Sequence, residues 1–206
     1  MIKKEIYPKT QRVKCIGAML EITEKIDGSN LVIFKLNNEI NIAQRNNIFK
    51  IDEITENKDK LYKGLYQWLL DNKDILQEEL IENSAICGEW IGMGKLKYPV
   101  DEFDKRFYMF AKANVYEDII LTNLKYEHEL FIYPFKSQVV PSCIGIVPVV
   151  GHIPYIPDKN NLDVMYERYV EKVGRNVEGF VIMYENNITK YVRMKNGKLQ
   201  EHFDRT

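Results

Sequence analysis

Residues 24–30 read Glu24-Lys25-Ile26-Asp27-Gly28-Ser29-Asn30 and place one lysine between an apolar run and a glycine turn. The apolar runs Met19–Ile22 and Leu31–Phe34 on either side are typical of buried strands, so we expect Lys25 at a strand end, over a pocket. The glycine permits a tight turn, and Asp27 is placed to orient the amine. A surface hairpin uses Asp-Gly for the same turn, so this stretch alone fits a hairpin as well as a nucleophilic lysine.

A lysine with an ordinary pKa of about 10.4 is protonated at neutral pH and is a poor nucleophile. A site that uses the amine must favour its neutral form through neighbouring cations, a metal ion or partial desolvation. Later in the chain, four segments carry charged or aromatic side chains suited to such tasks. They are Cys87-Gly88-Glu89-Trp90-Ile91-Gly92, Arg106-Phe107-Tyr108-Met109-Phe110-Ala111, Val177-Glu178-Gly179-Phe180-Val181-Ile182 and Lys190-Tyr191-Val192-Arg193-Met194-Lys195.

This ordered set of segments resembles the covalent nucleotidyltransferases, the superfamily of polynucleotide ligases and mRNA capping enzymes. Its members use a lysine amine to attack the α-phosphate of a nucleoside triphosphate, which gives a lysine-nucleotide phosphoramidate and pyrophosphate. Lys25 would be that amine. The resemblance implies an α+β fold, an ATP-grasp-like nucleotidyltransferase (adenylation) domain with antiparallel sheets flanked by helices.

The resemblance also implies which side chains contact the nucleotide. Glu24 would be one contact, Glu89 would hold the ribose, and Phe110 would stack on the purine, with Tyr108 as the alternative platform. Arg45, at the end of a predicted hairpin strand, resembles the arginine that many RNA ligases place near the ribose and the end of the nucleic acid.

The same comparison implies the groups that manage phosphate charge. Glu178 would contact the nucleotide and organise a divalent metal, Mg²⁺ with Mn²⁺ as the alternative, because hard cations prefer oxygen ligands. Period-2 alternation predicts Arg193 and Lys195 on one face of a strand, where two cations form a phosphate clamp. With Lys25 they complete the expected catalytic set.

Within the superfamily, the heptapeptide with the Gly-Glu-Trp-Ile-Gly segment is most similar to the RNA ligase 2 branch. We therefore expect an ATP-dependent RNA ligase that forms lysyl-AMP, passes AMP to a 5′-phosphate and seals it to a 3′-hydroxyl in RNA repair. A DNA ligase or a GTP-using mRNA-capping guanylyltransferase core shares the motifs and stays an alternative. A non-catalytic nucleotide- or RNA-binding module of the same fold is a third interpretation.

The length of 206 residues predicts one nucleotidyltransferase domain over 1–206, with no appended OB-fold or helical C-terminal domain. The expected partners are RNA, as a nicked duplex or as free ends, DNA-containing nicks, and an accessory protein that replaces the missing domain. A net charge of −1 does not favour non-specific binding to polyanions, although a local basic groove is compatible with it.

The remaining signals concern scaffold and location. We expect one or two amphipathic helices over 54–81, a helix over Asn161–Val173 that ends at Gly174, and a hairpin turn at Asn37-Asn38. The three cysteines are far apart, which indicates neither a zinc site nor a disulfide framework. With no secretory signal and no long apolar stretch, we expect no membrane partner and a cytoplasmic location in a bacterial or phage-infected cell.

Overall fold

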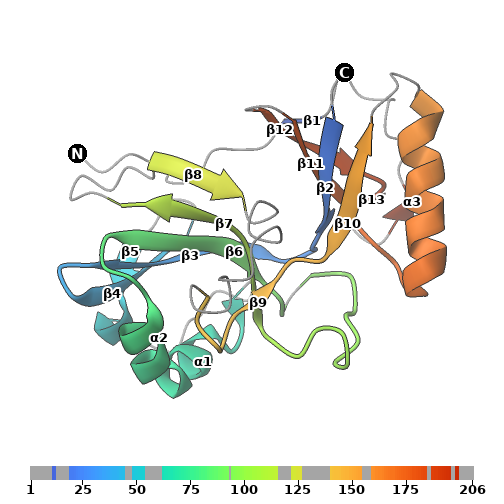
Figure 1. The fold of residues 1–206 in the computed structure, drawn as a ribbon. Coiled ribbons are helices and arrows are strands. Elements are labelled where there is room, and N and C mark those ends of the chain that lie inside the picture. The colour runs from blue at the N-terminus through green and yellow to red at the C-terminus, as the bar shows by residue number, and fades with distance from the viewer. Residues whose placement is uncertain are drawn as a thin grey trace. The chain divides into compact units, whose positions relative to one another are not determined.

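The computed structural model describes residues 11–12, 19–44, 48–53, 62–92, 94–115, 122–126, 140–154, 159–184, 187–195 and 198–199. These residues form two compact units (Figure 1). Unit 1 takes the described residues from Gly28 to Ile146 except Lys95–Lys97, and unit 2 takes all the others. The predicted single domain over 1–206 stays a prediction.

Unit 1 contains a seven-stranded sheet in the order β5-β4-β3-β6-β7-β8, with β9 paired to β7 (Figure 1). Its strands are β3 (Ser29–Leu36), β4 (Glu39–Ala43), β5 (Ile48–Lys50), β6 (Ser84–Trp90), β7 (Phe107–Asn114), β8 (Thr122–Tyr126) and β9 (Gly145–Ile146). All pairs in this sheet are antiparallel except β7 with β9. The strand predicted over Leu31–Phe34 is therefore the buried centre of β3.

The turn between β3 and β4 has a local cause. Asn37 and Asn38 adopt φ values of 54° and 59°, and Leu36 pairs with Glu39 across the turn. A two-residue hairpin loop with both central residues at positive φ matches the twist of its strands, and asparagine tolerates that conformation. The predicted hairpin turn is confirmed.

Short helices cover the apolar side of this sheet. They are η1 (Ile51–Glu53), α1 (Leu65–Asp71) and α2 (Lys73–Glu79). Their apolar side chains pack into one cluster with strand residues, and its buried members include Leu65, Leu69, Leu76, Leu31, Ile42, Ile86, Trp90 and Phe107. The predicted helices are confirmed within 62–81, and residues 54–61 lie outside the described residues.

Unit 2 contains a five-stranded sheet in the order β1-β12-β11-β2-β10, with helix α3 beside it (Figure 1). The elements are β1 (Gln11–Arg12), β2 (Met19–Lys25), β10 (Val149–Pro154), α3 (Lys159–Val173), β11 (Gly179–Tyr184) and β12 (Asn187–Val192), and β13 (Met194–Lys195) pairs separately with β14 (Lys198–Leu199). Only β1 and β12 pair in parallel among these strands. The order places β2 and β11, which bring Lys25 and Glu178, side by side.

Helix α3 ends as predicted, because Gly174 follows it with a φ of 66°, the left-handed conformation that favours glycine. One face of the helix packs on the sheet in a cluster of buried residues. Its members are Leu20, Ile22, Leu162, Tyr166, Tyr169, Val177, Phe180, Ile182 and Tyr191. The helix and the sheet of unit 2 therefore share one core.

The predicted α+β class with largely antiparallel sheets and flanking helices is confirmed, and its ATP-grasp-like detail stays a prediction. Within the part of the chain that the structure describes, no helix is both long enough and apolar enough to span a membrane.

Candidate active site

Lys25 and Glu178 face each other at the ends of two adjacent strands of unit 2. Lys25 is the last residue of β2, and its backbone pairs with Gly179, the first residue of β11. The Lys25 Nζ donates a hydrogen bond of 2.6 Å to the Glu178 Oε2, and the two side chains are 22% and 17% exposed. The predicted strand-end position of Lys25 is confirmed, and the amine has a carboxylate partner.

The backbone around Glu178 is fixed from the neighbouring strand. Its carbonyl oxygen accepts hydrogen bonds of 2.9 Å from the amides of both Arg193 and Met194. A Cβ atom on Gly179 would lie 2.0 Å from the Tyr191 carbonyl oxygen, so only glycine permits this approach. These contacts fix the backbone of Glu178 directly before the start of β11.

Burial raises the pKa of the Glu178 carboxyl, and this is the largest influence on it. The charges of Lys25 and Lys190 act in the opposite direction, and Asp27 adds to the rise. A carboxylate in this position is stabilised by a cation, so the oxygens of Glu178 fit a hard divalent metal as well as the Lys25 ammonium. Among the described residues, no three His, Cys, Asp or Glu side chains gather to hold a metal ion.

The strand predicted over 190–195 is interrupted at Arg193, which lies between β12 and β13. The interruption follows from the two amides, of Arg193 and Met194, that turn toward the Glu178 carbonyl. Strict alternation therefore does not carry through this point, and the prediction of one continuous strand over 190–195 is wrong. The phosphate clamp of Arg193 and Lys195 stays a prediction. Lys195 lies in β13, and its side chain is outside the described residues.

Helix α3 supplies the acidic partner of Arg193. The Asp163 Oδ1 lies 3.7 Å from the Arg193 Nε and accepts a hydrogen bond from the Tyr191 hydroxyl. Burial and the Asp163 carboxylate raise the pKa of Tyr191, so this hydroxyl remains a donor. Asp163 therefore ties the helix to the segment that carries Arg193.

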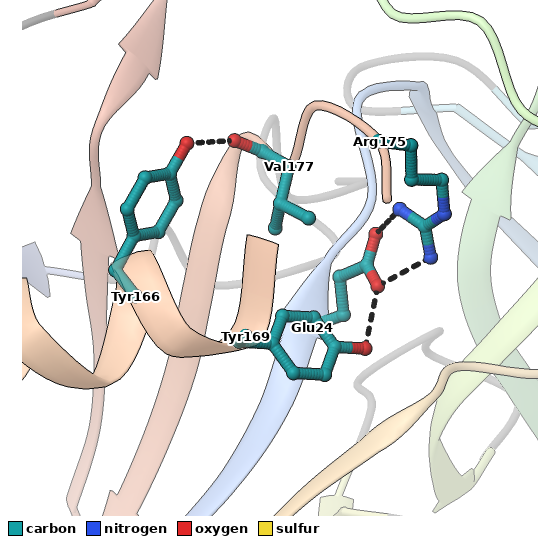
Figure 2. Close-up of polar contacts among 5 residues, drawn as sticks. All are labelled: Glu24, Tyr166, Tyr169, Arg175 and Val177. Atoms are coloured by element: carbon teal, nitrogen blue, oxygen red, sulfur yellow. Dashed lines mark hydrogen bonds and ion pairs between the residues drawn. The ribbon is translucent and has the colours of Figure 1, made fainter. Parts of the chain in front are cut away.

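Glu24 points away from Lys25, into the core of unit 2. Its carboxylate bonds to Arg175 and to the Tyr169 hydroxyl (Figure 2). A side-chain contact between Glu24 and a nucleotide would compete with these bonds. The predicted nucleotide contact of Glu24 stays a prediction.

Asp27 has a backbone partner that the sequence does not reveal. Its Oδ2 accepts hydrogen bonds from the amides of Lys95 and Leu96, at 2.5 and 2.9 Å. These two amides belong to the short stretch of unit 2 that follows β6 in the chain. The Asp27 carboxylate thus fastens a loop, and the Lys25 amine donates a hydrogen bond to Glu178.

Unit 1 holds Glu89 and Phe110 on the adjacent strands β6 and β7. Glu89 lies within β6 and is half-buried. The pairs Cys87 with Ala111 and Gly88 with Met109 leave Phe110 as one extra residue on β7. Such a bulge turns a side chain out of the regular alternation, and bulges are frequent beside active sites.

The alternative stacking residue, Tyr108, is packed inside unit 1. It is 4% exposed, its ring lies 5.1 Å from that of Phe103, and its hydroxyl accepts a hydrogen bond from the Lys105 amide. Phe110 is half-buried. The accessible aromatic side chain of this pair is therefore Phe110.

The structure gathers Glu24, Lys25, Glu178 and Arg193 in unit 2 and Glu89 and Phe110 in unit 1. Arg45 lies outside the described residues. Sequence reasoning missed Asp163, Tyr169 and Arg175. Two of these lie in α3, six positions apart, and the third is a lone arginine three positions before Glu178.

Comparisons with known proteins identify the family of this chain. The RNA ligase family model matches residues 19–196 of this chain. A search among curated proteins found no match. The family match covers every described candidate residue of the site, from Glu24 to Lys195.

Solved structures of a Naegleria gruberi RNA ligase are similar in fold. A lysine-to-alanine mutant with ATP and Mn has a TM-score of 0.59 and 19% identity, and the match covers 93% of this chain and 56% of that chain. The same ligase with PPi has a TM-score of 0.58 and 18% identity, and the match covers 93% of this chain and 58% of that chain. A glutamate-to-alanine mutant with AMP and Mn has a TM-score of 0.55 and 17% identity, and the match covers 90% of this chain and 55% of that chain.

This chain thus spans little more than half the length of the Naegleria gruberi protein. At this level of identity, the similarity shows a shared fold. The family model covers most of the chain, including both units. The chain belongs to the RNA ligase family.

Proposed function

We propose that this chain is an ATP-dependent RNA ligase that adenylylates itself on Lys25. The observation that carries the proposal is the Lys25 Nζ, which lies 2.6 Å from the Glu178 Oε2 at the ends of two paired strands. An amine held beside a carboxylate of raised pKa, in a chain of the RNA ligase family, fits the nucleophile of that family.

The first step would form a bond between the Lys25 Nζ and the α-phosphorus of ATP. The bond from that phosphorus to the β-phosphate oxygen breaks, pyrophosphate leaves with the bonding electrons, and the amine loses its proton to solvent. The hydrogen bond to Glu178 favours the ammonium form, so the ion pair represents the resting state. The carboxylate of Glu178 must turn to another cation before the amine attacks.

A divalent metal ion supplies such a cation and, when bound, neutralises phosphate charge. Glu178 would hold it, as Mg²⁺ or Mn²⁺, and Arg193 and Lys195 would contact the phosphates. Glu89, Phe110 and Arg45 would contact the nucleoside, as the family resemblance implies. Mn accompanies ATP or AMP in structures of the Naegleria gruberi ligase, which supports a nucleotide with a divalent ion.

Strand joining is the further part of the proposal. A 5′-phosphate oxygen of RNA would attack the α-phosphorus of lysyl-AMP, releasing the Lys25 amine and giving an adenylylated end. A 3′-hydroxyl would then attack the 5′-phosphate and expel AMP. The substrate would be a nicked RNA duplex or RNA ends, with DNA-containing nicks as a second substrate and an accessory protein as an aid to nucleic-acid binding.

The decisive experiment incubates the purified chain with α-labelled ATP or GTP and either Mg²⁺ or Mn²⁺. Denaturing mass analysis of the intact protein and of its Lys25 peptide then locates the adduct. We expect AMP on Lys25, none in Lys25→Ala, and an unchanged adduct in Lys73→Ala, whose lysine forms a surface ion pair with Asp52.

Each other outcome points elsewhere. An AMP adduct that persists in Lys25→Ala refutes the assignment of the nucleophile. A GMP adduct would indicate a capping enzyme core, and ATP binding without any adduct would indicate a non-catalytic nucleotide-binding module. Sealing of a nicked RNA duplex, compared with a nicked DNA duplex, then tests the joining reaction.

A further inference from the structure

Glu24, the residue before Lys25, has a buried carboxylate that accepts hydrogen bonds at both oxygens. The Glu24 side chain is 0% exposed and that of Arg175 is 9% exposed. The Arg175 Nη1 lies 2.6 Å from the Glu24 Oε1, and its Nη2 lies 2.8 Å from Oε2 (Figure 2). The Tyr169 hydroxyl donates a third bond of 2.8 Å to Oε2. Three donors from two residues therefore fix the orientation of one carboxylate.

The members of this network come from three separate elements. Glu24 is the penultimate residue of β2, and Tyr169 lies in α3. Arg175 lies in the loop that joins α3 to β11 and precedes Glu178 by three positions. Figure 2 shows the Arg175 guanidinium and the Tyr169 hydroxyl converging on Glu24. The network thus connects the end of the strand that carries Lys25 with the loop that carries Glu178.

The network contacts Lys25 through the backbone. Successive residues of a strand point to opposite faces, so Glu24 shares its face with Ile22, which is buried in the core of unit 2. The Glu24 amide also donates a 2.9 Å hydrogen bond to the Pro148 carbonyl. Side chain and main chain of Glu24 are both held, and its neighbour Lys25 is positioned by them.

Stability alone does not account for such a pair. A buried ion pair is often replaced by apolar residues of similar volume without loss of stability, because desolvation offsets the attraction. A two-pronged guanidinium-carboxylate contact does fix direction and distance, which an apolar contact does not. At the residue before a reactive amine, fixed direction is the useful property.

We propose that Arg175 and Tyr169 are positioning residues that act through Glu24 to hold the end of β2, and with it the Lys25 amine, opposite Glu178. The value of this position for catalysis rests on the proposed adenylylation of Lys25. The positional claim itself concerns the fold of unit 2 and is measured without any nucleotide.

The test uses the full chain with Tyr169→Phe, which removes one hydroxyl, and Arg175→Lys, which keeps the charge and loses the two-pronged contact. Tyr166→Phe is the matched control, because Tyr166 lies on the same helix and donates a 2.7 Å bond to the Val177 carbonyl instead of to Glu24. Amide hydrogen exchange is measured at Glu24 and, as an internal reference, at Ile22 in the middle of the same strand.

We expect exchange at Glu24 to be roughly 10- to 100-fold faster in Tyr169→Phe and Arg175→Lys, as loss of a bond to a charged group predicts. Exchange at Ile22 and in the control should stay at the wild-type rate. Unchanged exchange at Glu24, or equal acceleration at Ile22, overturns the positional claim.

Single-turnover adenylylation adds the catalytic readout. At saturating ATP we expect the rate of Lys25-AMP formation to fall about tenfold in both variants, with half-saturation by ATP within about twofold of wild type. If exchange at Glu24 is faster but the rate of Lys25-AMP formation is unchanged, the proposal that this network positions Lys25 is overturned. If wild type forms no adduct, the proposed function fails, and the exchange result still decides the positional claim.

Discussion

Replacement of Gly179 by alanine tests how tightly the segment that carries Glu178 is packed. The added Cβ would lie 2.0 Å from the Tyr191 carbonyl oxygen and 2.9 Å from the Val192 Cα. Both atoms belong to the backbone of β12, so no side-chain rotation relieves the overlap. The strands β11 and β12 must separate, at the point where Arg193 and Met194 donate to the Glu178 carbonyl.

Gly151 offers a control in the same sheet. Its φ is 155° and that of Gly179 is 157°, so alanine bears a similar backbone cost of about 1–3 kcal/mol at either position. At Gly151, however, nothing lies within 4 Å of the added Cβ. The difference between the two variants is therefore the cost of the overlap, for which we expect about 2–3 kcal/mol.

The assay is urea unfolding followed by far-ultraviolet circular dichroism. Both tryptophans, Trp68 and Trp90, lie in unit 1, so their fluorescence would not report unit 2 directly. We expect Gly179→Ala to lower the free energy of unfolding by about 3–6 kcal/mol in total, which is a large part of the stability of an ordinary domain. Adenylylation should fall with it, because Glu178 is displaced. Equal unfolding free energies for the two variants, within about 0.5 kcal/mol, would refute the packing argument.

Three further outcomes follow from single contacts. Asp163→Asn should lower the free energy of unfolding by about 1–2 kcal/mol, because the ion pair with Arg193 is lost, and an unchanged value in urea unfolding contradicts this. Asp27→Ala should speed tryptic cleavage after Lys95 in limited proteolysis, because two amide bonds to the carboxylate are lost, and cleavage at the wild-type rate argues against the loop anchor. Burial raises the pKa of Cys143 to about 11, so its thiolate fraction at pH 8 is small and grows about tenfold per pH unit toward that value. Alkylation at pH 8, read by mass spectrometry, should be about 100-fold slower than in the urea-unfolded chain, and similar rates would exclude the burial.

Features with a local cause could be predicted from the sequence. Two consecutive asparagines between apolar runs predict a hairpin turn, because both residues tolerate positive φ. A periodic apolar stretch followed by Gly174 predicts the extent of α3 within two residues at its start. Lys25 stands at a strand end because its apolar run stops before the Asp-Gly turn. In each case a few neighbouring residues determine the conformation.

Features that depend on tertiary contacts could not be predicted from the sequence. Arg175 and Glu24 are 151 positions apart, and nothing near Glu24 indicates which cation satisfies it. Period-2 alternation placed Arg193 on a regular strand face, but two amides that bond to one carbonyl interrupt the strand there. The bulge that carries Phe110 is likewise visible only in the pairing of β6 with β7.

Helix α3, which the sequence indicates only as scaffold, connects parts of the site that the motifs present as separate. Three of its side chains bond to three different segments of unit 2. The pairs are Asp163 with Tyr191, Tyr166 with Val177 and Tyr169 with Glu24. Each partner lies within two positions of a predicted site residue. The three bonds arise from one helix, but of the three only the bond from Tyr169 reaches the strand that carries Lys25. The position of Lys25 therefore depends on a contact between β2 and α3 as well as on its own turn.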